Sequence, residues 1–312
     1  MNSAVVTITL NPALDKTVTL DEFQFGGLNR ITDWRMDPGG KGINVAKVLK
    51  HFAVEVTCSG FTAGHQGQVL SEKLQELGIP HRFTETEGET RINLKVYEER
   101  SNITTELNEP GFTVTAASLE AFLINYREAV QGAAVVVLGG SLPPGAPADL
   151  YKTLTELANA AGVRTVLDAD GEAFVHGIEA VPFAIKPNIH ELESLFQETF
   201  TTDEDIIAAA RRLTEKGIAL VAVSLGGDGS ILVTKDEAIR AKPFPITPMS
   251  TVGAGDSMVA AMIYCMLHGK TLEETARWTS AAGTVTASKP GTQVCTLPEV
   301  EEKLSSVTIW KP

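Results

Sequence analysis

The hydrophobic positions of this chain alternate between short β-branched runs and longer stretches with a helical period. The runs that we expect to be strands are Val5–Leu10, Val54–Ser59, Ala134–Leu138, Val163–Leu167, Phe183–Ile185 and Leu220–Leu225. The stretches that we expect to be helices are Ile43–Phe52, Gln66–Leu77, Ala148–Ala161, Asp203–Lys216, Gly255–His268 and Leu272–Ala287. The strands have little polar alternation and are separated by helices, which predicts burial on both faces and parallel crossovers. The expected fold class is α/β, a doubly wound parallel sheet with helices on both faces.

Two stretches, at about 16–36 and 90–108, break the alternation of strands and helices because neither contains a helical pattern. In the second, apolar Ile92, Leu94 and Val96 alternate with polar residues, which is typical of a half-exposed strand. We expect the segments of about 16–36 and 90–108 to come together as a small projecting sheet. Such a sheet would cover the binding site as a lid, while ligands of the main sheet bind at the C-terminal ends of its strands.

Composition narrows the possible classes of protein. The chain has 312 residues, of which 43% are hydrophobic, a mixture typical of a globular protein. We therefore expect residues 1–312 to form a single domain. The 26 Lys and Arg against 39 Asp and Glu give a formal net charge of −13, which argues against a non-specific binder of nucleic acid or of anionic membranes. Any anionic substrate then needs a local basic pocket.

Cysteine usage and the N-terminal residues indicate a cytoplasmic protein. Residues 1–3 lead directly into an apolar run, 4–10, without the basic start and cleavage site of a signal peptide. The longest apolar run, 259–267, is well short of the roughly 18 residues that a membrane span needs. The three cysteines form no CxxC pair, so we expect them to be reduced and to bind no metal: Cys58, Cys265 and Cys295.

The motif Gly253-Ala254-Gly255-Asp256 stands directly before an apolar helix. Its glycines allow the N–H groups of residues 252–256 to converge, and a helix N-terminus favours negative charge, so the motif predicts an anion hole for a transferring phosphoryl group. Asp256 would then be positioned to accept a hydroxyl proton as a general base. The alternative is that Asp256 only complements the helix dipole.

A second glycine cluster, Gly39-Gly40-Lys41-Gly42-Ile43-Asn44, also leads into a helix. It is not a Walker A loop, because Gly42 follows the lysine where Ser or Thr is required. A polar ligand could approach this backbone closely, with Lys41 and Asn44 within reach. A tight turn followed by a helix start is the alternative.

Four further motifs follow expected strands. Asn188 and Glu191 have the spacing of a helix capping box, and Ser224–Gly229 is either a nucleotide-contacting loop or a hairpin turn. Gly139–Gly145 lacks the Gly-x-Ser-x-Gly pattern of a nucleophile elbow. Asp15, after the first strand, could hold a sugar hydroxyl or cap a turn. No Gly-x-Gly-x-x-Gly follows that strand, which disfavours a dehydrogenase.

Together these motifs resemble the ribokinase-like sugar kinases, specifically the phosphofructokinase B branch, over nearly the whole chain. The matching segments occur in the family's order: Thr9–Asp15, Gly39–Asn44, Thr90–Asn93, Gly140–Pro143, Lys186–Asn188, Ser224–Gly226 and Val252–Asp256. Within the branch, Gly26–Arg30, Thr90–Asn93 and His190–Glu193 resemble the bacterial 1-phosphofructokinases, and the tagatose-6-phosphate kinases are the alternative. Relatives often carry Asp-[Ser/Thr]-Ser-Gly-Glu where this chain has Asp168-Ala169-Asp170-Gly171-Glu172, so local contacts there are expected to differ.

The resemblance implies a kinase that moves the γ-phosphoryl group of ATP, with Mg²⁺, to fructose 1-phosphate. It implies that Asp256 is the catalytic base and that Gly253, Ala254 and Gly255 form the anion hole. Around the sugar it implies Asp15, Gly40, Lys41 and Asn44. Because the substrate brings its own phosphate into an acidic protein, we expect Arg91, Lys41 and Arg30 to bind that phosphate, and we also expect Gly39, Asn93 and Ser141 at the sugar site. Near ATP it implies Lys186, Asn188, Ser224, Gly226, Gly229 and Thr251, with Glu191 organising Mg²⁺. The expected assembly is a homodimer formed through the lid, and the remaining alternative class is a sugar-phosphate-binding regulator without catalysis.

Overall fold

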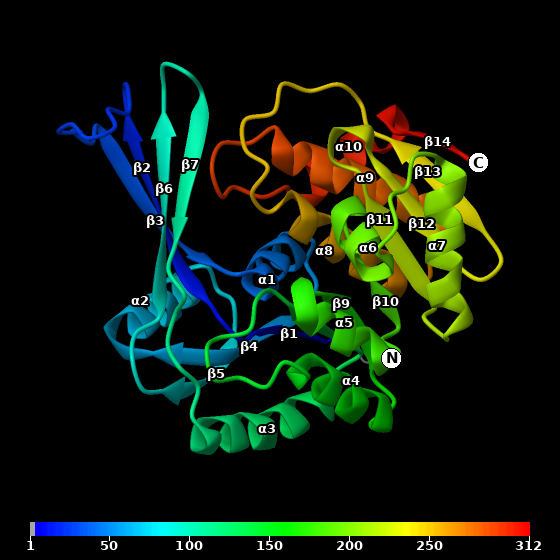
Figure 1. The fold of residues 1–312 in the computed structure, drawn as a ribbon, viewed down its shortest axis with the longest axis horizontal. Coiled ribbons are helices and arrows are strands. Elements are labelled where there is room, and N and C mark those ends of the chain that lie inside the picture. Colours follow the sequence, from blue (N-terminus) through cyan, green and yellow to red (C-terminus); the bar gives the residue numbers. More distant parts are fainter. Residues whose placement is uncertain (1–3) are drawn as a thin grey trace.

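The computed structural model describes residues 4–312 and arranges them around a ten-stranded sheet (Figure 1). Met1, Asn2 and Ser3, which lack the basic start of a signal peptide, lie outside the described residues. In spatial order the strands are β14 (Thr308–Trp310), β13 (Ala238–Lys242), β12 (Ser230–Val233), β11 (Leu220–Ser224), β10 (Ala184–Ile185), β9 (Arg164–Asp168), β8 (Val135–Gly139), β1 (Val5–Thr9), β4 (Val56–Ala63) and β5 (His81–Thr86). Every pairing from β11 through β5 is parallel.

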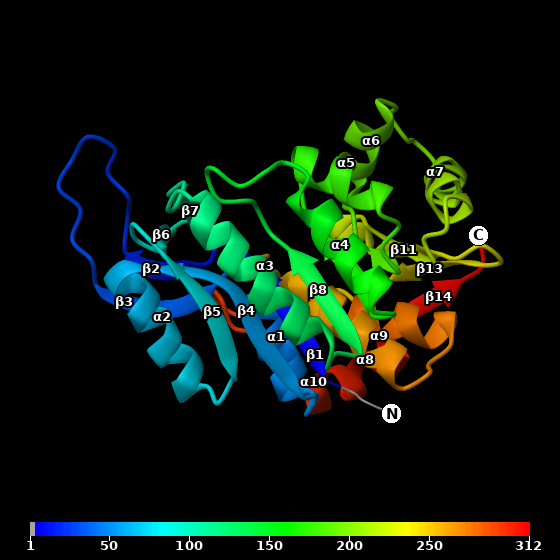
Figure 2. The ribbon, with the colours of Figure 1, turned by 90° about the horizontal axis from the view of Figure 1, so that it is seen from below.

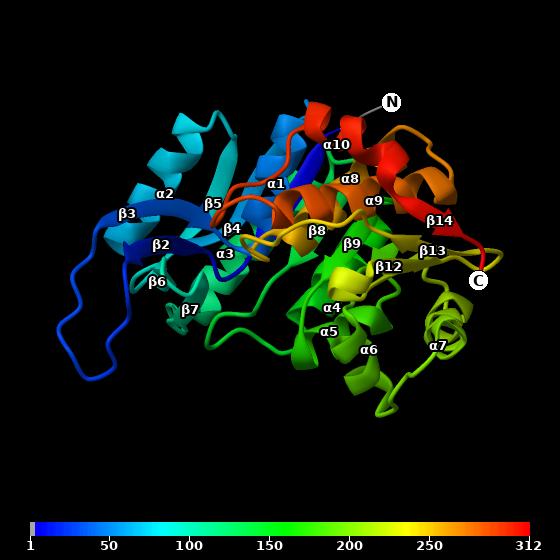
Figure 3. The same cartoon turned by 90° about the horizontal axis from the view of Figure 1, so that it is seen from above.

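Helices cover both faces of this sheet, as Figures 2 and 3 show from opposite sides. One face packs against α1 (Lys41–His51), α2 (Gly64–Glu76), α8 (Ala254–Leu267), α9 (Leu272–Ala287) and α10 (Leu297–Lys303). The other packs against α3 (Ala116–Val130), α4 (Leu150–Ala160), α5 (Gly171–Glu179), α6 (Ile189–Phe196) and α7 (Asp203–Glu215). In β8, Val135 and Val137 enter the first core and Val136 and Leu138 the second. The prediction of a doubly wound α/β fold is therefore confirmed.

One edge of the large sheet departs from the predicted parallel arrangement. Strands β11, β12, β13 and β14 pair antiparallel, and a single 3-10 turn, η1 (Gly226–Asp228), connects the first two. A second 3-10 turn, η2 (Leu304–Ser306), precedes β14. The added strands have three to five residues, too short to give a clear pattern in the sequence.

A separate four-stranded sheet, called the small sheet below, stands apart from the large one (Figure 1). Its order is β3 (Asp33–Gly39), β2 (Ala13–Leu20), β6 (Arg91–Glu98) and β7 (Ile103–Asn108). The chain leaves β1 and enters β2 almost at once, and β3 ends directly before α1. This connectivity places the small sheet over the C-terminal end of β1, where ligands are expected to bind.

The structure contains no helix within residues 4–312 that is both long enough and apolar enough to cross a membrane.

Candidate active site

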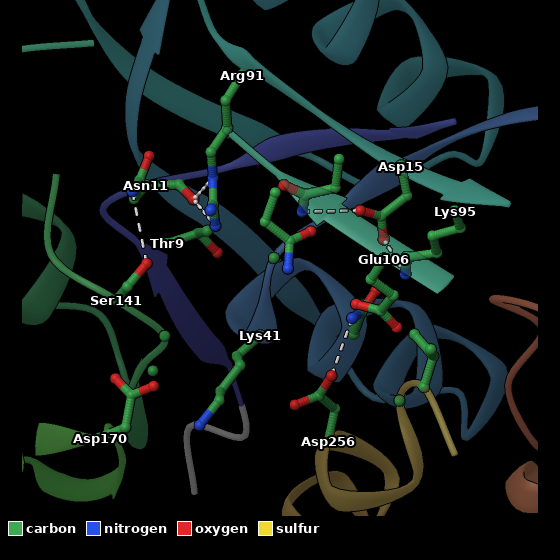
Figure 4. Close-up of a pocket in the computed structure, with 18 of the residues that line it drawn as sticks. Thr9, Asn11, Asp15, Lys41, Arg91, Lys95, Glu106, Ser141, Asp170 and Asp256 are labelled. Atoms are coloured by element: carbon green, nitrogen blue, oxygen red, sulfur yellow. Dashed lines mark hydrogen bonds and ion pairs between the residues drawn. The ribbon is translucent and has the colours of Figure 1, made fainter. Parts of the chain in front are cut away.

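A cavity of about 430 Å³ lies where the small sheet meets the C-terminal ends of β1 and β8 (Figure 4). Polar side chains from both sheets point into it. Of the residues predicted for the site, the cavity is lined by Asp15, Gly40, Lys41, Asn44, Arg91, Asn93, Ser141, Thr251, Gly253 and Asp256. The cavity therefore brings together segments that are as much as 247 residues apart in the sequence, from Thr9 to Asp256.

Asp256 lies in the first turn of α8, and its side chain points into the cavity (Figure 4). The helix begins after Gly253, whose φ of 78° lies in the left-handed region that glycine adopts without steric cost. Oδ2 of Asp256 accepts a hydrogen bond of 2.9 Å from the Asn44 amide nitrogen. Burial, together with the negative charge of Asp168, raises the pKa of Asp256 to about 6, although Asn44, Lys41 and Lys186 act in the opposite direction. Asp256 therefore has the protonation behaviour of a general base near neutral pH.

The ammonium group of Lys186 lies beside the N-terminus of α8. A Cβ placed on Gly255 would lie 3.4 Å from Nζ of Lys186. The N–H groups of a helix's first turn have no acceptor within the helix and carry a partial positive charge. Ala254 differs from its neighbours, because its N–H donates to the Thr251 carbonyl at 3.3 Å.

Asp168 joins two lysines at the floor of the site. Nζ of Lys41 lies 3.1 Å from Oδ1 of Asp168, and Nζ of Lys186 lies 3.4 Å from the same atom. Although burial disfavours its charge, the ammonium groups of Lys186 and Lys41 lower the pKa of Asp168. This carboxylate thus fixes the two lysines near each other, with Lys41 lining the cavity and Lys186 next to α8.

On the small sheet, Asp15 is held by two residues of the neighbouring strand. Its Oδ1 accepts from the Asn93 amide at 3.1 Å, and its Oδ2 accepts from Lys95 Nζ at 3.1 Å. The parallel register opposes Asp15 to Asn93, and Lys95 follows Asn93 by two residues on the same face. A Cβ on Gly39 would lie 2.6 Å from the Asp15 carboxyl carbon, so glycine is required there.

Arg91 is the third cation that lines the cavity, besides Lys41 and Lys95. Its Nε and Nη2 donate to the Asn11 carbonyl at 3.3 and 3.1 Å, and Nη1 donates to the Glu109 carbonyl at 3.2 Å. Within residues 4–312 no carboxylate lies within ion-pair distance of Arg91, whereas Lys41 and Lys95 are each paired with one. Burial lowers the pKa of Arg91, against the effect of Asp15, Asp170 and Glu109. The guanidinium is therefore held rigidly while its charge is not neutralised by direct pairing.

Three buried polar atoms at the cavity have no hydrogen-bond partner among the described residues. They are Oγ1 of Thr9, Oδ1 of Asn11 and Oδ1 of Asn93, and all three residues line the cavity. Buried polar atoms are rarely left unpaired in folded proteins. A Cβ on Gly42 would lie 2.6 Å from Oγ1 of Thr9, and a Cβ on Gly111 would lie 2.4 Å from Oδ1 of Asn11, so these two atoms face neighbouring backbone and not the open space of the cavity.

Most of the residues predicted near ATP lie outside the cavity, at neighbouring strand ends. Asn188 and Ser224 form a parallel β-bridge. At Gly226 a Cβ would meet no other atom within 4 Å, so the space beside this residue is open. Gly229 differs, because a Cβ there would lie 2.1 Å from the carbonyl oxygen of Ala241, so its glycine is explained by packing. The predicted capping box of α6 is confirmed, since Oδ1 of Asn188 accepts from the Glu191 N–H and Oε2 of Glu191 accepts from the Asn188 N–H.

Arg30 does not reach the cavity. It is exposed in the long loop between β2 and β3, which extends away from the small sheet (Figure 2). Its neighbours in this loop are almost all exposed, so nothing folds the arginine back toward Asp15 or Arg91.

Several residues that line the cavity were not assigned to the site from the sequence: Thr9, Asn11, Lys95, Glu106, Asn108, Gly139, Gly140 and Asp170. The sequence could have indicated Lys95, because it lies two residues after Asn93 and therefore continues the polar face of the strand that carries Arg91 and Asn93. Glu106 and Asn108 pair with Lys95 and Asn93 across the β6–β7 register, which the sequence pattern alone does not specify.

Comparison with known proteins gives a consistent result. The model of the pfkB family of carbohydrate kinases matches residues 4–300. The 1-phosphofructokinase of Xanthomonas campestris is 37% identical over 90% of each chain, and that of Escherichia coli K12 is 35% identical over 99% of each. The phosphofructokinase-2 of Escherichia coli, solved in complex with potassium, superimposes with a TM-score of 0.93 at 31% identity, covering 97% of this chain and 99% of the other. The same enzyme has also been solved in a tetrameric inhibited form, with a TM-score of 0.91, 30% identity and the same coverage.

Proposed function

The chain belongs to the pfkB family of carbohydrate kinases, and from this premise we propose that it transfers the γ-phosphoryl group of ATP to fructose 1-phosphate, giving fructose 1,6-bisphosphate. The observation that carries the proposal is the position of Asp256, which faces a cation-lined cavity from the N-terminus of a helix. The names of the relatives support the choice of sugar, because two of them at 35 and 37% identity are 1-phosphofructokinases. Tagatose 6-phosphate is the alternative acceptor.

The chemistry assigned to the site is mostly positioning and charge stabilisation. Asp256 accepts the proton of the free primary hydroxyl as that oxygen attacks the γ-phosphorus, and the bond to the β-phosphate oxygen breaks. The N–H groups of Gly255 and Asp256 in the first turn of α8, with Lys186 beside Gly255, stabilise the charge on the transferring group. Asp15, Asn44, Asn93 and Ser141 orient the sugar, while the ATP site extends over Asn188, Ser224 and Gly226.

Mg²⁺ fits this site only as a partner of nucleotide phosphates. Among residues 4–312 there is no group of three or more His, Cys, Asp or Glu that could hold a metal ion by itself. Mg²⁺ commonly takes one or two carboxylates together with substrate phosphates, and the half-buried carboxylate of Glu191 lies on the nucleotide side. When bound with ATP, the ion neutralises charge on the phosphates.

We propose that the small sheet acts as a lid over the sugar. The lid and the large sheet would together form a single catalytic domain. Its strands β2 and β6 supply Asp15, Arg91, Asn93 and Lys95, so the sugar lies between the two sheets. Closing such a sheet would exclude water and prevent transfer of the phosphoryl group to water.

A panel of acceptors tests the proposed substrate. With ATP as donor and ADP release as the readout, we expect kcat/KM to be highest for fructose 1-phosphate, lower for tagatose 6-phosphate and lowest for free fructose. Discrimination in kcat/KM reports differences in transition-state binding. Equal values for fructose and fructose 1-phosphate would show that no phosphate pocket exists, and a preference for tagatose 6-phosphate would favour the alternative.

The proposed assembly is a homodimer formed through the small sheet. The sheet and its β2–β3 loop expose an unusual set of large apolar side chains: Phe23, Phe25, Leu28, Ile31, Trp34, Ile103 and Leu107. Phe25 is 98% exposed and Leu28 is 73% exposed. Exposed apolar patches of this kind mark interaction sites, and β3 and β7 are open sheet edges.

Sedimentation velocity tests the dimer. We expect the wild type to sediment as a dimer and the double variant Phe25→Asp, Leu28→Asp as a monomer, because two buried carboxylates without partners oppose association. Ile124→Asp is the matched control, since Ile124 is 51% exposed but lies on α3, away from the small sheet. A monomeric wild type would contradict the proposal.

The compartment proposed for the enzyme is the cytoplasm. Cys58, Cys265 and Cys295 are all unpaired and buried, which suits a reducing environment.

A further inference from the structure

A buried lysine lies behind the cavity and is connected to the proposed general base. Lys47 stands on α1, three residues after Asn44, and is 8% exposed. Its ammonium group donates to Oδ1 of Asn44 at 3.3 Å and to the carbonyl oxygen of Pro38, which belongs to β3. Lys47 does not line the cavity.

Asn44 connects this lysine to Asp256. The amide nitrogen of Asn44 donates to Oδ2 of Asp256 at 2.9 Å, and its oxygen faces Lys47. An asparagine amide can be turned by half a rotation, which exchanges its donor and its acceptor. An ammonium group has donors only, so its presence requires the Asn44 oxygen on its side and the N–H donors on the side of Asp256.

The environment of Lys47 indicates that its charge serves a purpose other than simple packing. Within residues 4–312 no carboxylate forms an ion pair with it, and burying a charge without a paired ion is costly. Its charged surroundings are Asp15, Asp37, Asp256 and Lys95, and burial lowers the pKa of Lys47 despite the three carboxylates.

We propose that Lys47 is a positioning residue that fixes the orientation of the Asn44 amide, so that Oδ2 of Asp256 always receives a hydrogen bond and Oδ1 stays available to the acceptor hydroxyl. This inference rests on the proposed role of Asp256 as the base. The same ammonium group binds the Pro38 carbonyl, so it also fixes the position at which the small sheet joins α1.

The pH dependence of Lys47→Met tests the proposal, because methionine keeps an unbranched side chain but has no donor. A hydrogen bond to a charged group corresponds to roughly one to two pKa units, so losing the fixed donor from Asn44 is expected to move the acid limb of kcat/KM upward by about one unit. With the pKa of Asp256 moved from about 6 to about 7, we expect kcat at pH 7 to fall about twofold and the KM for ATP to change little. Lys50→Met, an exposed lysine on the same helix, is the matched control and should match the wild type.

Asn44→Ala separates a positioning role from a structural one. It must produce an upward shift of the acid limb at least as large, and adding Lys47→Met to it must shift the limb by much less than Lys47→Met does alone, because Lys47 acts mainly through Asn44 and only weakly through its own charge. Thermal melting confirms that each variant is folded. Two results would overturn the proposal. The first is an unchanged acid limb in Asn44→Ala, which can be measured even if Lys47→Met does not fold. The second is a wild-type pH profile in folded Lys47→Met.

Failure of this inference and failure of the proposed function give different results. If Asp256→Asn keeps its activity, the assignment of the base is wrong. If Asp256→Asn is inactive and Lys47→Met titrates like the wild type, only the role of Lys47 is wrong.

Discussion

Asp256→Asn is expected to lower kcat by roughly 10²- to 10⁴-fold, the usual contribution of a general base. Asparagine keeps the shape of the side chain, and its oxygen can still accept from the Asn44 amide, which donates to Asp256 at 2.9 Å. What is lost is the ability to accept the proton of the sugar hydroxyl. Because the ATP site is formed by other residues, the KM for ATP should stay close to that of the wild type. Steady-state kinetics with ATP and fructose 1-phosphate measures both quantities.

The matched control for this variant is Asp205→Asn. Asp205 and Asp256 both occupy the third position of a helix, but Asp205 caps α7 through Thr201 and Thr202, away from the cavity. The control should keep the wild-type kcat. A near-wild-type kcat for Asp256→Asn would remove Asp256 from the chemistry and leave it as a helix-terminal residue that complements the dipole.

The pH profile of the wild type gives a second measurement of the same assignment. The pKa of Asp256 is raised to about 6, chiefly by burial and then by Asp168, and the carboxylate is the active form. Activity is therefore present above about pH 6 and is lost as the pH falls below it, with log kcat/KM decreasing by about one for each pH unit. An acid limb that persists unchanged in the residual activity of Asp256→Asn would belong to another group.

Much of the large sheet was predictable because parallel strands such as β8 are apolar runs that a helical pattern follows, whereas the parallel edge strand β5 (His81–Thr86) is polar, is followed by β6, and was not predicted. The run 134–138 illustrates this, since alternate valines of β8 enter the cores on opposite faces. The antiparallel edge was not predictable, because β14 has three residues and pairs with β13 some 66 positions earlier, from Lys242 to Thr308. Such a pairing depends on how α8, α9 and α10 return the chain to this edge.

The site was predictable where local backbone chemistry specifies it. Gly253 needs its left-handed φ, and Asn188 forms a capping box with Glu191. Both features depend on residues adjacent in the sequence, so a short motif is enough to predict them. The residues that were missed depend on cross-strand register instead. Lys95 meets Asp15 only because β2 and β6 align in parallel. Arg30 lies in an exposed loop whose hydrogen bonds are mostly internal, so no strand register places it, and its role stays a prediction.

Arg91→Met is the variant expected to change sugar recognition most. Arg91 is the cavity's fixed cation without a paired carboxylate among the described residues, so we assign it to the phosphate that the substrate already carries. Losing a charge-assisted contact of about 1.5 to 3 kcal/mol should raise the KM for fructose 1-phosphate roughly ten- to hundredfold. The KM for ATP should change little, because Lys186 and Asn188 are unaffected.

Two comparisons make the Arg91 result specific. Arg127→Met, an exposed arginine on α3, should leave both KM values unchanged. Arg91→Met should also affect free fructose far less than fructose 1-phosphate, because only the phosphorylated sugar offers an anion to the guanidinium. The guanidinium also donates to the carbonyls of Asn11 and Glu109, so thermal melting must show that the variant is folded. If the variant loses affinity for both sugars equally, Arg91 supports the shape of the cavity, and the phosphate is bound by Lys41 or Lys95 instead.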